Sequence, residues 1–158
     1  MGTQWSEGPL TGLRVKQQAT CSTCGFALWT PIVKLSVSHV GLYDDARFPG
    51  RLIVSLDEHV EHFDQANPEV LAAFMADLQL ASLVLRKMGN VDRVNIAVLG
   101  NKDPHLHAHV IPRRVTDANF GAAPWENAEP HSKLTPEDRV TIVDLLRQGF
   151  DEVVASHS

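Results

Sequence analysis

The sequence predicts an α+β domain in which an antiparallel sheet packs against two helices. Short runs of alternating or β-branched residues indicate strands, and two longer segments show apolar residues at helical spacing after helix-start signals. The links between the strand candidates are short and turn-like, which favours antiparallel neighbours. With 158 residues, of which 44% are hydrophobic, the chain has enough apolar material for one core.

The N-terminal segment differs in composition from the rest of the chain. Residues 1–20 are polar and interrupted by Gly2, Gly8, Pro9 and Gly12. Such a segment cannot hold a regular period, so we expect an N-terminal arm over 1–20 and a single folded domain over 21–158.

Two strand candidates come first in the expected domain. Residues 32–43 are rich in Val, Ile and Leu with alternation, which predicts one or two strands. Asp44 and Asp45 then open a turn that runs through Pro49 and Gly50. Residues 51–56, with the sequence RLIVSL, form the next strand candidate.

A helix is predicted to begin at Pro68. Asn67 supplies an N-cap, Pro68 suits the first helical position, and Gly89 with Asn90 ends the pattern. Its apolar stripe predicts a packing face against the sheet, and it consists of Leu71, Phe74, Met75, Leu78, Ala81, Leu85 and Met88.

Two further strands and a second helix complete the expected domain. Residues 91–99 and 106–111 are strand candidates joined by a tight link, so they are expected to pair antiparallel. Residues 116–133 read as a loop. The second helix begins after Thr135, and its expected buried side consists of Val140, Val143, Leu146, Phe150 and Val153.

Composition limits the classes of partner. The formal net charge is −5 and no dense Lys/Arg cluster occurs, which argues against a nucleic-acid partner. No apolar run reaches the roughly 18 residues of a membrane span, and no secretory signal pattern opens the chain. We therefore expect a cytoplasmic protein with no membrane partner. A small phosphorylated ligand needs only a local positive site.

The most informative feature is the run from His105 to Ile111, HLHAHVI. Alternate residues of a strand face the same way, so His105, His107 and His109 are expected to line one face. Imidazole is a common ligand for metals such as Zn²⁺, and it is also a good nucleophile near neutral pH. The spacing alone leaves both uses open.

The longer string NIAVLGNKDPHLHAHVIPR, residues 95–113, resembles the histidine-triad (HIT) family. The family motif alternates three histidines with apolar residues, and His105 to Ile111 meets every position of it. The resemblance continues through 48–54 and His59 back to Cys21 and Cys24, and forward to Phe120, Pro124 and Trp125. It implies a HIT-like fold with about five antiparallel strands and two helices, and a homodimer.

The resemblance also implies roles for the three histidines. His107 is expected to attack the α-phosphorus of a nucleotide and form a nucleotidyl-histidine intermediate, which water then hydrolyses. The backbone carbonyl of His105 is expected to hold Nδ1 of His107, and His109 to hydrogen-bond a phosphate oxygen or the bridging atom. The implied substrates are diadenosine polyphosphates or adenosine phosphoramidates, as in the bacterial diadenosine-polyphosphate-hydrolase-like branch.

Other positions are expected to bind the nucleotide. Asn95 matches a family asparagine beside the phosphate, and Asp44 or Asp45 stands where an acid would hold the ribose, although a solvated turn explains either acid equally well. Trp125 could cover the pocket or simply pack. Many HIT enzymes have Gln-Ser before the triad, whereas this chain has Asn101 and Lys102, so the leaving group stays open.

Cys21 and Cys24 have the spacing of a zinc knuckle. By resemblance to one bacterial branch, His59 and His105 would complete a structural zinc site that takes no part in the chemical step, with His62 as a nearby competitor to His59. The alternatives are two reduced thiols without metal and a thioredoxin-like redox pair, whose βαβ context is absent.

Two rival functions accompany the enzyme hypothesis. One is a nucleotide-binding or adaptor protein with weak turnover. The other is a metal-dependent enzyme that uses all three triad histidines as ligands. Among the remaining candidates, Trp29 is expected to pack, and Arg113 to contact phosphate or lie in solvent.

Overall fold

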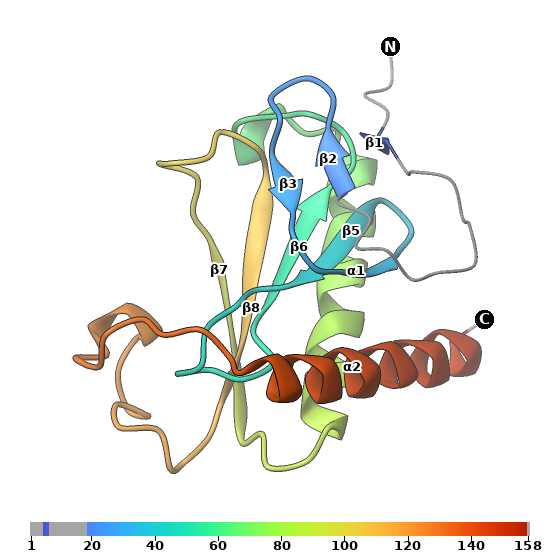
Figure 1. Cartoon of the computed structure of the whole chain (residues 1–158). Coiled ribbons are helices and arrows are strands. Elements are labelled where there is room, and N and C mark those ends of the chain that lie inside the picture. Colours follow the sequence, from blue (N-terminus) through green and yellow to red (C-terminus); the bar gives the residue numbers. More distant parts are fainter. Residues whose placement is uncertain (1–4, 7–18, 158) are drawn as a thin grey trace.

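The computed structural model describes residues 5–6 and 19–157, which form a five-stranded sheet, a small three-stranded sheet and two long helices (Figure 1). The large sheet has the order β4-β5-β6-β8-β7 and is antiparallel throughout. Its strands are β4 (Pro31–Lys34), β5 (Ser38–Leu42), β6 (Leu52–Leu56), β7 (Arg93–Val98) and β8 (His107–Arg113). The expected α+β architecture is confirmed.

The small sheet was not predicted from the sequence. It consists of β1 (Trp5–Ser6), β2 (Ala19–Cys21) and β3 (Ala27–Leu28), paired antiparallel in that order. Strands of two or three residues are too short to show a period, so only their tertiary pairing reveals them. The rest of the expected arm, residues 1–4 and 7–18, lies outside the described residues.

Helix α1 (Pro68–Lys87) lies along one face of the large sheet, against β6, β7 and β8 (Figure 1). The side chain of Asn67 accepts a hydrogen bond from the backbone N–H of Glu69 at 2.9 Å, as an N-cap does. Gly89, with φ of +81°, ends the helix in the left-handed conformation. By length and composition alone α1 is apolar enough to cross a membrane, but core helices pass the same test.

Helix α2 (Pro136–Ser156) packs on α1 and on β4. Thr135 caps it by accepting from the backbone N–H of Asp138 at 3.1 Å. The two helices approach closely at Gly149, where an added Cβ would lie 2.9 Å from a methyl group of Val84. Two expected core residues are wrong: Val140 is 63% exposed and Met75 is 49% exposed, because each lies at the margin of its helix stripe.

A single apolar core fills the space between the sheet and the helices. The helices supply one layer of this core and the inward side chains of the strands supply the other. Its fully buried members include Val40, Leu52, Val54, Phe74, Ala81, Val84, Ala108, Val110, Leu146 and Phe150. The opposite face of the sheet carries the histidines.

A buried carboxylate fixes the turn between β4 and β5. Asp77 of α1 accepts four hydrogen bonds, from the backbone N–H groups of Ser36 and Val37 and from the hydroxyls of Ser36 and Ser38. The side chain is 2% exposed, so these donors replace the water that the carboxylate loses. The contact ties α1 to the sheet and has no access to a ligand.

Two short 3₁₀ helices, Phe63–Gln65 and Pro124–Glu126, complete the described elements. The second interrupts the long segment that follows β8, which is otherwise a loop as expected. This segment folds back over the histidine face beside β7, and it brings Trp125 toward that face.

Candidate functional site

The pairing of β8 with its neighbours places the histidines on the sheet face away from α1. His107 stands opposite Ser55 of β6, and His109 stands between Ile53 of β6 and Ala97 of β7. His105 lies two residues before the start of the strand and continues the same row, because Phe26 stacks on the rings of both His105 and His107. The predicted row of three imidazoles therefore exists, although only two of them lie within the strand.

Hydrogen bonding determines the tautomer of His107. Its Nδ1 lies 2.6 Å from the backbone carbonyl oxygen of His105. A carbonyl only accepts, so Nδ1 must carry a proton and donate, and in the neutral ring Nε2 therefore keeps its lone pair. No hydrogen-bond partner for this Nε2 occurs among residues 5–6 and 19–157. His107 is 5% exposed, and an imidazole with this tautomer has the lone pair on Nε2 that a nucleophile requires.

His109 has the opposite tautomer. A guanidinium nitrogen of Arg51 lies 2.9 Å from Nδ1 of His109. Arginine only donates, so Nδ1 accepts and Nε2 carries the proton. Burial, followed by the charges of Arg51 and His107, lowers the pKa of His109 to about 4. The ring is therefore neutral at pH 7 and offers an N–H donor at Nε2.

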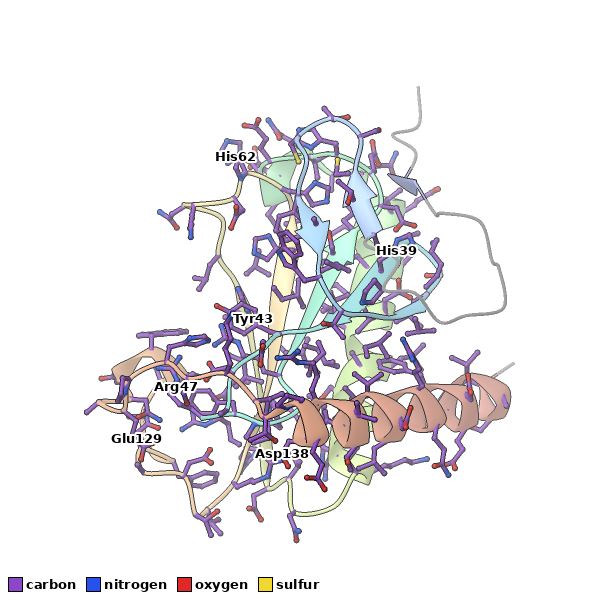
Figure 2. All side chains as sticks on the ribbon, viewed as in Figure 1. His39, Tyr43, Arg47, His62, Glu129 and Asp138 are labelled. Carbon is purple, nitrogen blue, oxygen red and sulfur yellow. The ribbon has the colours of Figure 1, made fainter. Side chains whose placement is uncertain are left out.

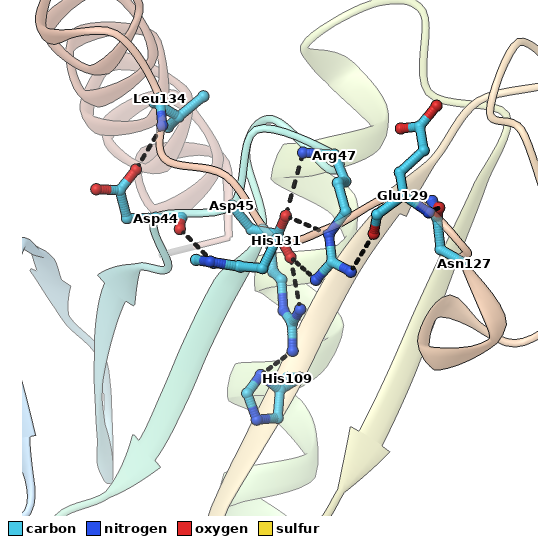
Figure 3. Close-up of polar contacts among 9 residues, drawn as sticks. Asp44, Asp45, Arg47, His109, Asn127, Glu129, His131 and Leu134 are labelled. Carbon is cyan, nitrogen blue, oxygen red and sulfur yellow. Dashed lines mark hydrogen bonds and ion pairs between the residues drawn. The ribbon is translucent and has the colours of Figure 1, made fainter.

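Arg51 belongs to a buried ion-pair cluster with Asp45 and Arg47. Figure 3 shows the contacts that run from Glu129 through Arg47 and Asp45 toward His109. Asp45 is fully buried and accepts from Arg47 and Arg51 at 2.9 Å each. Burial would raise the pKa of Asp45, but the hydrogen bonds and charges of the two arginines outweigh it and lower the pKa. The cluster carries one net positive charge beside His109.

His105 faces a cluster of metal-ligand atoms. Its Nε2 lies 2.8 Å from the carbonyl oxygen of Leu56, so Nε2 donates and Nδ1 keeps its lone pair. That Nδ1 lies 3.5 Å from Sγ of Cys24 and 3.4 Å from Nδ1 of His59. Sγ of Cys21 lies 3.8 Å from Nδ1 of His59, and the four ligand atoms all lie within 4.8 Å of one another.

The three separations of 3.4, 3.5 and 3.8 Å fit a tetrahedral zinc ion. Zn–S and Zn–N bonds of about 2.3 and 2.0 Å at tetrahedral angles place ligand atoms about 3.3–3.8 Å apart. Burial, reinforced by the neighbouring Cys21 thiol, raises the pKa of Cys24, while burial lowers the pKa of His105. The cluster includes His59; His62 is exposed and lies outside it. The hydrogen bond from His105 to Leu56 is the kind that orients a metal-bound imidazole.

The turn that carries the cysteines also delivers an aromatic ring that the sequence did not predict at the site. Cys21 and Phe26 are joined by a backbone hydrogen bond of 2.7 Å, and Gly25 makes the turn possible with φ of +76°. The ring of Phe26 stacks on His105 at 5.1 Å and on His107 at 4.7 Å between centroids. A Phe two residues after CxxC carries no recognised motif, so only the fold brings it to the histidine row.

Two cavities border Trp125, and a histidine of the row lines one of them. One, of about 300 Å³, is lined by His109, Arg47, Arg51 and Tyr43, with Ala97, Leu99, Ile111, Pro124 and Trp125. The other, of about 480 Å³, lies between β7 and the segment from Phe120 to Trp125, and Asn95 lines it. Trp125 is 66% exposed and borders both. Arg51 lies over the Tyr43 ring at 4.2 Å, which makes this wall of the smaller cavity aromatic and cationic.

The two acids expected at the ribose already have partners within the chain. Asp45 is held by the arginines, and Asp44 accepts from the backbone N–H of Leu134 at 2.8 Å and from Arg139 at 2.7 Å. Asp44 thereby ties the start of α2 to the end of β5. The structure places Asn101 and Lys102 in an exposed bend between β7 and His105.

Two other expectations are wrong. Trp29 is 76% exposed in the turn between β3 and β4, where no core layer reaches it. Arg113 is 1% exposed and holds the loop after β8, because its guanidinium donates to the backbone carbonyls of Asn119 and Ala122 and to the side chain of Asn95. Arg113 therefore supports the segment that carries Trp125, and its guanidinium is not available to bind phosphate.

The two groups of residues lie at opposite ends of the histidine row. Figure 2 shows His62 near the β2–β3 turn, and Tyr43 and Arg47 at the other end, where the segment after β8 folds back. His105 therefore belongs to the sulfur-rich end and His109 to the arginine-rich end. Among the described residues, the only metal-ligand group is the one that contains Cys21 and Cys24, so His107 and His109 are not grouped with His105 as ligands.

Comparison with known proteins agrees with this geometry. A family model described as the HIT domain matches residues 33–116, just over half of the chain. A histidine triad protein from Sinorhizobium meliloti is 26% identical with a TM-score of 0.69, over 76% of this chain and 88% of that one. A histidine triad protein from Bradyrhizobium japonicum gives the same identity and TM-score, over 76% and 89%.

A zinc-bound histidine triad family protein from Mycobacterium smegmatis shares the fold, with a TM-score of 0.62 and 23% identity over 80% of this chain and 86% of that one. No curated protein matched the chain.

Proposed function

This chain belongs to the HIT domain family, and we propose that it is a nucleotide hydrolase or transferase that works through a nucleotidyl-histidine intermediate on His107. The proposed substrates are diadenosine polyphosphates or adenosine phosphoramidates. The observation that carries the proposal is the hydrogen bond from Nδ1 of His107 to the carbonyl of His105, at 2.6 Å, which leaves Nε2 free to attack.

The proposed reaction has two steps. Nε2 of His107 attacks the α-phosphorus, the bond from phosphorus to the leaving group breaks, and its electron pair departs with that group. The positive charge that forms on the ring is stabilised by the carbonyl of His105. Water then attacks the phosphorus, the N–P bond returns its electrons to Nε2, and a nucleoside monophosphate and a proton are released.

His109 acts as a hydrogen-bond donor in this proposal. Its neutral ring presents Nε2–H at the cavity beside His107, and the two rings are 5.4 Å apart in an edge arrangement. A donor placed there stabilises charge that develops on a phosphoryl oxygen. Asn95 and Trp125 line the cavities and are proposed to contact the nucleotide, and Asn101 and Lys102 to approach the leaving group.

We propose a structural zinc ion held by Cys21, Cys24, His59 and His105. The ligand separations described above support it. Such an ion would fasten the β2–β3 turn to the start of β8 and would leave no open position for substrate. It supplies no step of the chemistry.

We also propose a homodimer formed through β7. Strand β7 is the edge of the five-stranded sheet, so one row of its backbone donors and acceptors faces outward. Ile96 and Val98 on this strand, with Leu99 after it, are more than 40% exposed, and exposed apolar edge strands favour pairing with a second chain. The division into an arm over 1–20 and a domain over 21–158, and a cytoplasmic location, stay predictions.

The test combines turnover with intact-protein mass. Wild type, His107→Ala and the matched control His157→Ala, which changes an exposed histidine at the end of α2, are incubated with diadenosine tetraphosphate and with adenosine phosphoramidate. We expect adenosine monophosphate from wild type and the control, a transient mass gain of one adenylyl group, and a loss of at least ~10³-fold in kcat for His107→Ala.

Two outcomes would overturn the proposal. Equal turnover by His107→Ala would remove the covalent mechanism. If wild type binds both nucleotides in calorimetry but turns over neither, the binding or adaptor function takes its place.

A further inference from the structure

We propose that Arg51 is a positioning residue that holds His109 as a neutral Nε2–H donor, and that the site therefore acts on phosphoanhydrides, whose leaving group needs no proton, rather than on phosphoramidates. This inference rests on the proposed function for its substrate class. Its structural part, the state of His109, stands on the contact between the two side chains and needs no substrate.

The contact between Arg51 and His109 fixes the direction of the hydrogen bond. One terminal nitrogen of the Arg51 guanidinium donates to Nδ1 of His109 at 2.9 Å, and the other donates to Asp45 at 2.9 Å. Arginine stays protonated under all conditions in which the protein is folded, so it cannot accept a proton from the imidazole. While this contact lasts, Nδ1 of His109 has no room for a proton, and the ring cannot become an imidazolium ion.

Neighbouring side chains hold Arg51 in place. Asp45 is fully buried, Arg47 donates to both of its oxygens, and the guanidinium of Arg51 lies over the Tyr43 ring at 4.2 Å. The side chain of Arg51 is only 14% exposed. Asp45, Arg47 and Tyr43 therefore fix the orientation of the Arg51 guanidinium. The fold thereby keeps His109 in its neutral state. Burial and the adjacent positive charges act in the same direction on the pKa of His109.

The leaving group of a phosphoanhydride suits a neutral donor. When His107 displaces a phosphate or a nucleotide from a phosphoanhydride, the P–O bond breaks and the oxygen leaves as an anion. This anion is weakly basic, since the second pKa of a phosphate is about 6. It needs a hydrogen-bond donor and nearby positive charge, which are Nε2–H of His109 and the guanidinium of Arg51.

A phosphoramidate makes a different demand. When its P–N bond breaks, the nitrogen must take up a proton, because an amine departs as a neutral molecule and its anion is far too basic to leave. A general acid that supplies this proton contributes about 10²–10⁴-fold. A general acid here would have to be an imidazolium ion. His109, held neutral by Arg51, can donate a hydrogen bond from Nε2–H but cannot transfer that proton, so this site favours the phosphoanhydride.

The first measurement is nitrogen-15 NMR on wild type in the absence of substrate. We expect His109 to show a protonated Nε2 and an unprotonated Nδ1 at pH 7. In Arg51→Met the two tautomers should mix, and the pKa of the ring should rise above about 4 but stay below the ordinary 6.5, because burial, the largest cause of the lowered pKa, remains. Arg114→Met is the matched control, since Arg114 contacts the carbonyl of Pro49 and lies outside the smaller cavity.

The second measurement is kcat/KM at pH 7 for diadenosine tetraphosphate and adenosine phosphoramidate. Wild type and Arg114→Met should prefer the phosphoanhydride by about 10²-fold. Arg51→Met should lose most of this preference, and its phosphoramidate rate should rise as pH falls below 7. Arg51→Lys, which keeps the charge, covers the case in which the methionine variant does not fold.

The outcomes separate this inference from the proposed function. An imidazolium or an Nδ1–H tautomer of His109 in wild type would overturn the role of Arg51. Faster wild-type turnover of the phosphoramidate would overturn the substrate preference alone. The expected tautomer with turnover of neither substrate would uphold the role of Arg51 and overturn the substrate preference together with the proposed function.

Discussion

The two ends of the histidine row give the same side chain opposite surroundings. At one end, Nδ1 of His105 faces Cys24 and His59 while its Nε2 donates to a backbone carbonyl. At the other, Nδ1 of His109 accepts from Arg51. The first end is built from thiols and imidazoles and suits a cation, whereas the second is built from arginines and suits an anion.

His107, between the two ends, takes its orientation from the first. The carbonyl of His105 accepts its Nδ1–H, and Phe26 from the cysteine turn stacks on its ring. In each of the three histidines, the hydrogen-bond partner of one ring nitrogen determines whether the other nitrogen carries a proton or a lone pair. A substitution at one end should leave the contacts at the other end unchanged.

The largest expected effect is at the sulfur-rich end. With free zinc at about 1,000 times its Kd, the ion should add about 4 kcal/mol to the free energy of unfolding. The double variant Cys21→Ser, Cys24→Ser should lose the bound ion and that increment, as measured by metal analysis and by urea unfolding with and without a chelator.

His62→Ala is the control for this experiment, because His62 is exposed and outside the cluster. A double variant that keeps one zinc per chain would show that the metal sits elsewhere. Because thiols must lose their protons to bind zinc and burial raises the pKa of Cys24, zinc affinity should increase as pH rises.

The next effect is at the arginine-rich end. Asp45→Asn leaves two guanidinium groups without their buried counter-charge and should cost about 3 kcal/mol in the free energy of unfolding. Asp44→Asn is the matched control: its pair with Arg139 is about one-third exposed, and its loss should cost about 1 kcal/mol. Equal costs for the two variants would contradict the distinction between a buried and a partly exposed pair.

A further effect at this end should depend on pH. The folded-state pKa of His109 is about 4, below the ordinary value of 6.5, so the unfolded chain binds more protons between these values. The free energy of unfolding should therefore fall as pH decreases from about 6.5 to about 4, with a slope of at most about 1.4 kcal/mol per pH unit from this group.

His109→Gln isolates this contribution, since glutamine can accept from Arg51 and does not titrate. Tyr43, His107 and Arg51 contact position 109 in both proteins and Asp45 holds Arg51, so the contributions of these groups largely cancel in the difference. Parallel pH curves for wild type and His109→Gln would show that His109 is not held neutral.

The smallest effect concerns Phe26, the ring that stacks on both His105 and His107. Phe26→Leu keeps apolar bulk but removes two stacked contacts, and it should cost about 1 kcal/mol in stability. If the stacking orients His107, kcat should fall while KM stays constant and zinc remains bound. Phe63→Leu, an exposed phenylalanine, is the control, and a KM effect alone would assign Phe26 to substrate contact.

Much of the fold follows from local patterns. The periods of residues 51–56, 91–99 and 106–111 predicted three strands of the sheet within one or two residues, and Asn67 and Thr135 marked both helix starts. These signals are readable because a strand or helix of sufficient length repeats its buried side at a fixed period. The alternation of His105, His107 and His109 likewise predicted that they share one face, because that spacing is a property of the strand alone.

The surroundings of those histidines depended on contacts between distant residues. Arg51 stands 58 positions from His109, and Phe26 lies 81 positions before His107, so no local pattern joins either pair. Trp29 and Arg113 were misplaced for the same reason, because exposure is decided by what packs against a side chain. Periodicity is local, so the sequence determined which residues form the row and, through the family resemblance, that the carbonyl of His105 holds His107. Tertiary structure alone decided that Arg51 holds His109, since that hydrogen bond requires two distant segments to meet in space.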